Sequence, residues 1–516
     1  MSRKPNPESF IFYQKKTADG QCYATYCPSN RKHGGKDVYL GTTIDTEKGI
    51  FYNRKSGFFR FTIEEGRTEL SPDEVEYFKL MRNHGANQAM IRPKLILDFG
   101  DAWFLEHVMN DSGLKEIFRK VLPESADTLL ALIAFKLLDN ATNSYALEWL
   151  EGSYARYLYP EARLASQRIS EFMDYLGQEE NMRLFWGVYF AYLKGIPELT
   201  DSILIDSTGM PNDIHFDYTA LSNHNGVISR EARLIFVVER SINMPVYFRY
   251  VAGNIVDVST LKTILNQLKA QGVDIKHGIM DAGYCSENNI RELFGQSIPF
   301  LIRLPAKSLS DNLIKQHGEE LYSTKYALRY GARIIFMKRV PIALYDHEVF
   351  AYIAIDAERQ KDEQNGYINR CLDNPKMKDK MSDDEFKSLG YFVLISSQCL
   401  ETEEVLPLYY MRQTVEQTFD YAKNDVDLLP LRSHNEDTFR GHLLLSFMAT
   451  ILLIMVNKLL KSRKKLGNIC AKKAFHALRR IKCNVYSNSL VTSEANKIAN
   501  LIQRELKLTV PQDLDL

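Results

Sequence analysis

The stretch YYMRQTVEQTFDYAK, residues 409–423, places Tyr409, Arg412, Glu416 and Lys423 at spacings that suit one face of a helix. At about 100° per residue, the four side chains fall within an arc of roughly 60°. This face suits phosphate groups near a metal ion, because Arg forks onto phosphate oxygens and Glu can hold a divalent cation. The competing interpretation is a solvated helix face with charge pairs one turn apart.

The spacing of these four residues continues into a longer pattern, YYMRQTVEQTFDYAKNDVDLLPLRSHNEDTFRGHLLLSFMA, residues 409–449. In this stretch the chain resembles bacterial insertion-sequence transposases of the Asp-Asp-Glu (DDE) type, in the insertion-sequence-four family that the Tyr-Arg-Glu-Lys motif defines. The resemblance is close over residues 200–460 and loose toward both ends. It implies an enzyme that binds the ends of a transposable element, cleaves the DNA and transfers the strand by two-metal phosphoryl transfer.

Two aspartates upstream stand where this resemblance requires the other two acids. Asp206 follows the apolar run Ile203–Ile205 in SILIDSTGM, so a strand ending there would push its side chain out of the sheet edge. Asp281 ends a similar run in IKHGIMDAGYC and precedes a helical pattern that begins near Ser286. A single Asp after a strand is more often a cap or turn residue, but three acids in this order favour a catalytic site.

The resemblance implies that Asp206, Asp281 and Glu416 are the catalytic residues. They would hold two Mg²⁺ ions, for which Mn²⁺ is a possible substitute, because carboxylate oxygens suit these cations. Asp420, one turn beyond Glu416, is the nearest alternative for the third acid. It ranks second to Glu416 because its side chain lies slightly off the face that the four motif residues share.

The resemblance also implies how the chain engages nucleic acid. Arg412 and Lys423 would position the DNA backbone, and Tyr409 would contact a phosphate or a displaced nucleotide. The partners would be double-stranded DNA, as terminal inverted repeats and target DNA, and a second copy of the chain in a homodimeric synaptic complex. Family members place end-recognition helices ahead of the catalytic core, and no membrane partner is expected.

The pattern between the acids predicts an α/β core. RLIFVVER (233–240) and PVYFRYVAG (245–253) predict a hairpin, VSTLKTILNQLKAQG (258–272) a helix, and IPFLIRLP (298–305) another buried strand. This order is that of a ribonuclease-H-like mixed sheet with its acids at one edge. The interval from Asp281 to Glu416 is too long for a minimal core of this kind, so an inserted unit must lie within it.

The pattern outside the core predicts further units. The expected organisation is a small β-rich N-terminal unit (1–85), a helical DNA-binding region (86–200), the catalytic core (201–305 and 391–430), a β-rich insertion (306–390) and a helical C-terminal region (431–516). The basic turn of the N-terminal unit is either a nucleic-acid contact or an ordinary surface turn. Its residues are Arg31, Lys32, His33 and Lys36.

The charge of the chain is balanced, with 65 Lys and Arg against 65 Asp and Glu in 516 residues. Affinity for DNA follows local patches, however, and the segment from Lys458 to Lys482 contains ten Lys or Arg and no acid. So many like charges predict a nearby polyanion that offsets their repulsion.

Two features bear on where the chain works. The apolar run HLLLSFMATILLIMVNKLL (442–460) is nearly long enough to span a bilayer, but its polar ends and the helical pattern before it favour a buried core helix. The seven cysteines lack regular metal spacing, and Cys22 and Cys27 are expected to be packed thiols. No signal-peptide pattern starts the chain, so we expect a reducing cytoplasm. The resemblance to insertion-sequence transposases implies a bacterial, nucleoid-associated protein.

Alternatives to an active transposase remain at this stage. One is a domesticated DNA-binding protein with the transposase fold but without turnover, and another is a metal-dependent nuclease without strand transfer. At the second aspartate the sequence reads Asp-Ala-Gly-Tyr (281–284), which matches other branches than the best-known one, where Asp-Arg-Glu-Ala-Asp stands. The presence of all three acids with the full helix motif favours the active enzyme over the domesticated protein.

Overall fold

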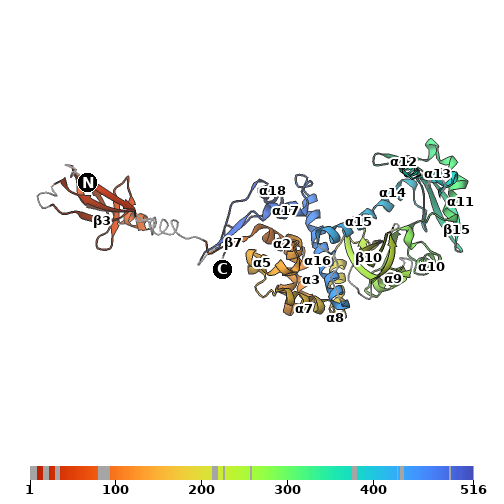
Figure 1. The fold of residues 1–516 in the computed structure, drawn as a ribbon, viewed down its shortest axis with the longest axis horizontal. Helices are drawn as coiled ribbons and strands as arrows, with labels where there is room; N and C mark the ends of the chain where they lie inside the picture. The colour runs from red at the N-terminus through yellow and green to blue at the C-terminus, as the bar shows by residue number, and fades with distance from the viewer. Residues whose placement is uncertain are drawn as a thin grey trace. The chain divides into compact units, whose positions relative to one another are not determined.

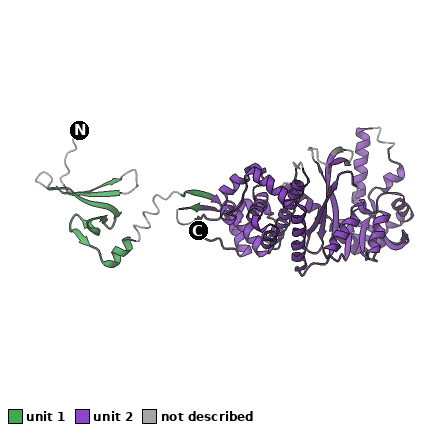
Figure 2. Cartoon of the chain, turned by 90° about the horizontal axis from the view of Figure 1, so that it is seen from below, with its two compact units in different colours: residues 1–96, 484–491, 513–516 green, residues 97–483, 492–512 purple. Residues whose placement is uncertain are grey.

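The computed structural model describes residues 8–15, 22–29, 35–79, 93–211, 219–224, 227–255, 259–374, 380–426, 428–429, 435–486 and 490–514. The chain divides into two compact units (Figure 2), residues 1–96 with 484–491 and 513–516, and residues 97–483 with 492–512. The basic residues Arg31, Lys32 and His33 lie outside the described residues, so the expectation of a nucleic-acid contact there stays a prediction.

The N-terminal segment forms an antiparallel sheet in which each strand pairs with the next along the chain. Its strands are β1 (Phe10–Lys15), β2 (Cys22–Cys27), β3 (Val38–Asp45), β4 (Ile50–Asn53), β5 (Gly57–Thr62) and β6 (Gly66–Glu69). Because side chains alternate between the faces of a strand, aromatic residues fill both faces of this sheet. Phe51 and Phe59 lie in one buried cluster, and Phe58 and Phe78 lie in another.

The first part of the second unit is mainly helical. Its helices are α2 (Gly100–Asp111), α3 (Leu114–Val121), α4 (Ala126–Leu138), α5 (Ala146–Gly152), α6 (Ala155–Leu158), α7 (Ser166–Leu176) and α8 (Glu179–Lys194). Toward the other end of the chain lie α16 (Glu436–Lys461), α17 (Ala471–Leu478) and α18 (Lys497–Leu506). Short strands β7 (Leu95–Asp98), β18 (Lys482–Val485), β19 (Leu490–Thr492) and β20 (Asp513–Leu514) form a small sheet of order β20-β19-β18-β7.

A large mixed sheet forms the centre of the second unit, with the strand order β11-β10-β8-β12-β13-β17-β16-β15-β14 and β9 paired with β10. Its strands are β8 (Ser202–Pro211), β9 (Ala220–His224), β10 (Val227–Glu239), β11 (Met244–Ala252), β12 (His277–Met280), β13 (Phe300–Arg303), β14 (Ala327–Tyr330), β15 (Arg333–Leu344), β16 (His347–Asp356) and β17 (Tyr391–Ser396). Strands β8, β12 and β13 are parallel, and their other pairings are antiparallel. The chain therefore has the mixed α/β architecture that the sequence predicts.

The elements between the first two acids follow the sequence pattern closely. The predicted hairpin is the antiparallel pair β10 and β11, and the predicted helix is α9 (Leu261–Ala270), which is followed by Gly272 at φ +75°. The helical pattern near Ser286 is α10 (Glu287–Gly295), whose first turn Ser286 caps through a hydrogen bond from the Asn289 amide. A polar side chain at this position satisfies an amide that has no partner within the helix.

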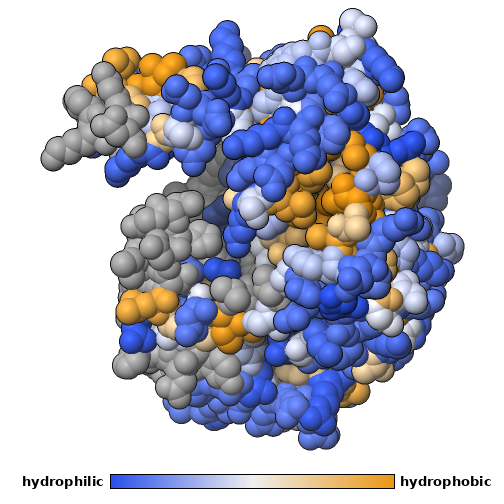
Figure 3. Space-filling model, turned by 90° about the vertical axis from the view of Figure 1, so that its right-hand side faces the viewer, coloured by the Kyte–Doolittle hydropathy of each residue, from blue (hydrophilic) through white to orange (hydrophobic). Residues whose placement is uncertain are grey.

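The segment 306–390, expected to be a β-rich insertion, is continuous with the central sheet. Its strands β14, β15 and β16 continue the central sheet through β17, because β16 pairs with β17 along its length. The segment also holds α11 (Ser308–His317), α12 (Ala357–Asp373) and α13 (Asp383–Ser388). Figure 3 shows the molecule from this end, where a hydrophobic patch lies within a mostly hydrophilic surface.

The apolar run 442–460 lies within α16, which Figure 1 shows between the first helices and the central sheet. The helix is long and apolar enough to cross a membrane, but 83% of its most apolar window is buried inside the protein. Close packing explains part of this burial, since a Cβ on Gly441 would lie 1.9 Å from the Met173 carbonyl oxygen. The structure thus agrees with the predicted core helix.

Phe447 of α16 is the centre of an aromatic cluster that joins helices to the sheet. Its ring lies 5.4 Å from Trp186 of α8, 5.1 Å from Phe248 of β11 and 5.9 Å from Phe236 of β10, measured between centroids. Phe236 in turn stacks on Phe419 at 4.9 Å and 8°. Aromatic pairs at such distances stabilise beyond the area that they bury.

We expect Phe447→Ala to lower the unfolding free energy of this unit by about 3–5 kcal/mol, because the cluster cannot collapse into the space of a buried ring. Urea unfolding followed by tryptophan fluorescence measures the loss, since Trp186 borders the ring. Phe447→Leu, which keeps most of the apolar volume, should cost clearly less. Equal losses in the two variants would contradict this assignment of the cluster.

Candidate active site

Strand pairing brings Asp206 and Asp281 to the same level of the sheet. Strands β8 and β12 run parallel, with Met280 opposite Ile205 as their last pair, so the next residues on both strands are the two acids. The expected end of the first strand at Asp206 is wrong, because β10 pairs with β8 as far as Pro211. At Asp206, β8 stops pairing with β12, although it continues to pair with β10.

The third acid, Glu416, lies on a helical segment that is less regular than predicted. Helix α14 (Thr402–Tyr410) ends before Arg412, α15 (Gln413–Asp420) carries Glu416, and a π-helix, η9 (Tyr421–Asp425), follows. The turn between α14 and α15 is tightened, because the amides of Arg412, Thr414 and Val415 each bond a carbonyl three residues back. The expectation of one straight helix with four residues on a narrow face is therefore wrong.

The guanidinium of Arg412 joins all three acids. Its Nη1 donates to Asp206 Oδ2 at 2.8 Å and lies 3.5 Å from Asp281 Oδ2, and its Nη2 lies 3.1 Å from Glu416 Oε1. Its side chain is only 18% exposed, as against 53% for Glu416. One cation thus balances a group of carboxylates that would otherwise repel one another in a poorly solvated place.

The electrostatics of Asp206 follow from this arrangement. Burial is the largest influence and raises the pKa of Asp206 to about 6, although Arg412 and the Ser207 amide lower it. The charges of Asp281 and Glu416 raise it further, which shows that the three acids share one electrostatic environment. Burial would lower the pKa of Arg412, but the surrounding acids and Tyr409 raise it, so the guanidinium stays charged.

The remaining two motif residues support the site through contacts within the chain. Tyr409 donates from its hydroxyl to Asp281 Oδ1 at 3.1 Å, and burial and the charge of Asp281 raise the pKa of this phenol. Lys423 donates from Nζ to Thr208 Oγ1 at 2.6 Å and to the Gly209 carbonyl at 2.8 Å, so it holds the end of β8 and does not reach the acids. Burial lowers the pKa of Lys423.

The donor set fits a hard divalent cation in kind, since three carboxylates supply oxygen ligands of the type that Mg²⁺ prefers. In the described residues, however, no three His, Cys, Asp or Glu side chains are grouped closely enough to hold a metal ion. The Arg412 guanidinium takes the central position among Asp206, Asp281 and Glu416. The acids can therefore receive a metal only if Arg412 moves aside. Asp420, the rival carboxylate, is exposed and makes no contact with Arg412 among the described residues.

A small cavity of about 90 Å³ beside the acids contains residues that the sequence analysis missed. Arg303 at the end of β13 and Arg359 of α12 line it together with Tyr409, Arg412 and Glu416. Arg303 follows the same pattern as the two aspartates, a polar residue at the end of a strand next to β12, and that signal is visible in IPFLIRLP. Arg359 comes from the segment 306–390, and nothing in the sequence pattern places it here.

Comparison with known proteins gives one family match and one similar solved structure. Residues 199–452 match the family model described as transposase DDE domain. A cryo-electron microscopy structure of the piggyBac transposase synaptic complex with hairpin DNA is similar to the chain, at 10% identity and a TM-score of 0.36, over 69% of this chain and 70% of that one. No curated protein sequence matches the chain. The family match covers every residue of the site and supports a transposase of the DDE type.

We expect Arg412→Gln to destabilise the protein by about 3–5 kcal/mol at pH 8, because it leaves partly buried carboxylates without their cation. The pKa of Asp206, already above its unfolded value, should rise further. An acid with a raised folded pKa loses stability as pH rises through the window between the unfolded and folded values, so the defect should be smaller at pH 5. Thermal unfolding at both pH values measures this.

Millimolar Mg²⁺ should restore more stability to Arg412→Gln than it adds to the wild type, since the cation can replace the lost charge. Arg333→Gln is the matched control, because Arg333 pairs at 2.8 Å with a single buried acid, Asp356. That variant should be destabilised without rescue by Mg²⁺. Equal effects of Mg²⁺ on the two variants would contradict a cation site at the three acids.

Proposed function

We propose that this chain is an active insertion-sequence transposase, on the premise that residues 199–452 match a transposase DDE domain. The observation that carries the proposal is the convergence of Asp206, Asp281 and Glu416 on one guanidinium within that region. The strand order around β8, β12 and β13, with a hairpin on one side and the acids at one edge, supports a ribonuclease-H-like core. The Tyr-Arg-Glu-Lys motif of Tyr409, Arg412, Glu416 and Lys423 supports the proposed membership of the insertion-sequence-four family.

DDE transposase domains use divalent metal ions, and we propose that Asp206, Asp281 and Glu416 hold two Mg²⁺, or Mn²⁺ in their place. Bound ions would activate water or a DNA 3′-hydroxyl and stabilise the leaving oxygen. Asp206 is a ligand only as a carboxylate, so cation binding should strengthen as pH rises past its pKa of about 6. Tyr409 would keep Asp281 oriented through its hydroxyl.

Arg412 would pair first with the three acids and then with a DNA phosphate. In the structure it balances the three acids, and a metal ion at those acids would displace it. The freed guanidinium offers a planar fork of donors that matches two phosphate oxygens. Arg303 and Arg359 line the same cavity, so the scissile backbone would meet a group of cations beside the acids. Lys423 would act by holding the end of β8 beside Asp206.

The substrate we propose is double-stranded DNA, as the terminal inverted repeats of the element and as target DNA. Two ends must be held together for transposition, so we propose a homodimer as the working unit on DNA, in a bacterial cytoplasm. A nuclease without strand transfer would need the same acids. The two functions differ in whether cut ends are joined to a target.

Asp206→Asn, Asp281→Asn and Glu416→Gln should each lower cleavage more than about 100-fold while leaving DNA binding intact, because each removes one metal ligand and no basic group. The substrate is a plasmid that carries the coding region with its flanking DNA, and band shifts on the flanking duplex report binding. Asp420→Asn is the matched control on the same helix and should cleave normally.

Near wild-type cleavage by any of the three variants would remove that residue from the site. Insertion of the cut ends into a second plasmid identifies a transposase, whereas cleavage without insertion would identify a nuclease. Loss of activity in Asp420→Asn with normal activity in Glu416→Gln would move the third acid to Asp420.

A further inference from the structure

A second cavity lies on the side of α15 that faces away from the acids. Its volume is about 170 Å³, and it lies between α15, the last turn of α16 and the turn that joins β10 to β11. Its polar lining includes Asn243, Thr414, Gln417, Tyr421, Lys458 and Lys461. No carboxylate of the described residues lines it.

The cavity shares a helix with the active site. Thr414, Gln417 and Tyr421 recur at three- and four-residue spacing and so lie on one face of the helical segment, whereas Glu416 is about 100° away from Gln417. A ligand in the cavity would therefore contact the same short helix that positions Glu416. Binding there can fix the helix without touching the acids.

The charges of the basic segment from Lys458 to Lys482 are distributed unevenly. Lys465 pairs with Glu505 at 3.1 Å, Lys472 with Asp425 at 2.7 Å, and Arg479 with Asp101 at 2.6 Å. Acids from distant parts of the chain therefore offset part of this charge, and the expectation of a nearby polyanion stays a prediction for the remaining cations.

Lys458 and Lys461 are the cations of this segment that line the cavity, and among the described residues neither they nor Arg463, Lys464, Lys473 and Arg480 form an ion pair. Lys458 is also half-buried, and burial lowers its pKa to about 8, with Glu239 acting weakly in the other direction. Lysines in the last turn of a helix interact favourably with its dipole, which explains cations at this end of α16. The dipole does not explain why a half-buried ammonium faces a cavity lined by neutral hydrogen-bonding groups.

We propose that this cavity, the Lys458 cavity, binds a phosphate group of the DNA backbone and so anchors α15 while the acids act on another phosphate. This proposal rests on the proposed function for its ligand. The cavity is smaller than ordinary small-molecule pockets, which span about 300–1,000 Å³, so a single phosphate group suits it and a nucleotide does not. Two ammonium groups with amide and hydroxyl groups match phosphate oxygens in charge and in hydrogen bonding.

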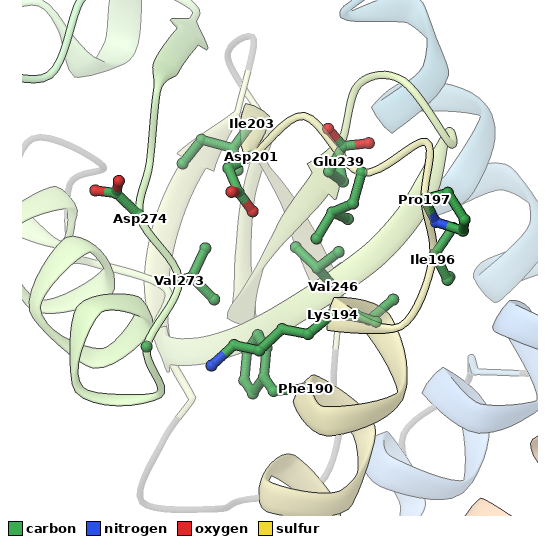
Figure 4. Close-up of a pocket in the computed structure, with 13 residues that line it drawn as sticks. Phe190, Lys194, Ile196, Pro197, Asp201, Ile203, Glu239, Val246, Val273 and Asp274 are labelled. Atoms are coloured by element: carbon green, nitrogen blue, oxygen red, sulfur yellow. The ribbon is translucent and has the colours of Figure 1, made fainter.

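A larger cavity differs from the Lys458 cavity in the charge of its lining. It has a volume of about 390 Å³ beside the start of β8 (Figure 4) and is lined by one cation, Lys194, with the carboxylates of Asp201, Glu239 and Asp274. Glu239 is already satisfied there, since it accepts hydrogen bonds from Thr200, Ser202, Ser241 and Ile242. Its excess of negative charge repels phosphate, so Lys194 serves as a control lysine.

The test measures the affinity of the full chain for a random-sequence duplex over about 50 to 200 mM salt, by fluorescence anisotropy. Each phosphate contact contributes about 0.9 to the slope of log affinity against log salt. Lys458→Gln and Lys461→Gln should each lower this slope by about one unit, and Lys194→Gln should leave it unchanged. Lys458→Arg should keep the wild-type slope, because it retains the charge.

A second arm uses inorganic phosphate as the probe. Phosphate should raise the thermal unfolding temperature of the wild type and of Lys194→Gln, and should not raise that of Lys458→Gln. Without phosphate, Lys458→Gln should unfold no earlier than the wild type, because the substitution removes a half-buried cation that lacks a counter-ion.

The outcomes separate this inference from the proposed function. If the wild type binds the duplex and the lysine variants keep its slope, the Lys458 cavity is not a DNA contact and the proposed function stands. Phosphate protection without a change of slope would identify a site for small anions and overturn the DNA assignment. A wild type that does not bind the duplex at any salt concentration would overturn the proposed function and this inference with it.

Discussion

The structure depends most on the bridge between the Arg412 guanidinium and the carboxylates of Asp206, Asp281 and Glu416. Three acids in a partly buried place repel one another, and burial, with this repulsion as a smaller cause, raises the pKa of Asp206. One internal cation makes the arrangement stable without a metal ion. The proposed mechanism starts from the same bridge, because a divalent cation bound by the three acids would take the place of the guanidinium and release it toward a phosphate.

Other elements of the second unit position the residues that form this bridge. The parallel pairing of β8 and β12 places two acids level with each other, and α15 brings Arg412 and Glu416 over them. An aromatic cluster connects α16 to α15, because Phe447 of α16 contacts Phe236 and Phe236 stacks on Phe419 of α15. The cavity between α15 and α16 therefore lies where an anion could influence the helix that carries the third acid.

Sequence pattern predicted the elements that depend on local periodicity, namely the strand that ends just before Asp281, the hairpin β10–β11, helix α9 and the buried helix α16. It did not predict the break before α15 or the π-helix that starts at Tyr421, because both depend on backbone hydrogen bonds that shift by one residue without changing hydrophobic spacing. It also missed contacts between residues distant in sequence. Examples are the ion pair of Arg412 with Asp206 and that of Arg479 with Asp101.

The central claim is that the three carboxylates form one cation site from which Arg412 withdraws when the protein acts on DNA. A structure of the protein with duplex DNA and Mn²⁺, with the metal located by its anomalous scattering, tests this most directly. We predict manganese among Asp206, Asp281 and Glu416, with the Arg412 guanidinium on a phosphate. Manganese absent from these acids, with Arg412 still joining them while DNA is bound, would contradict the account.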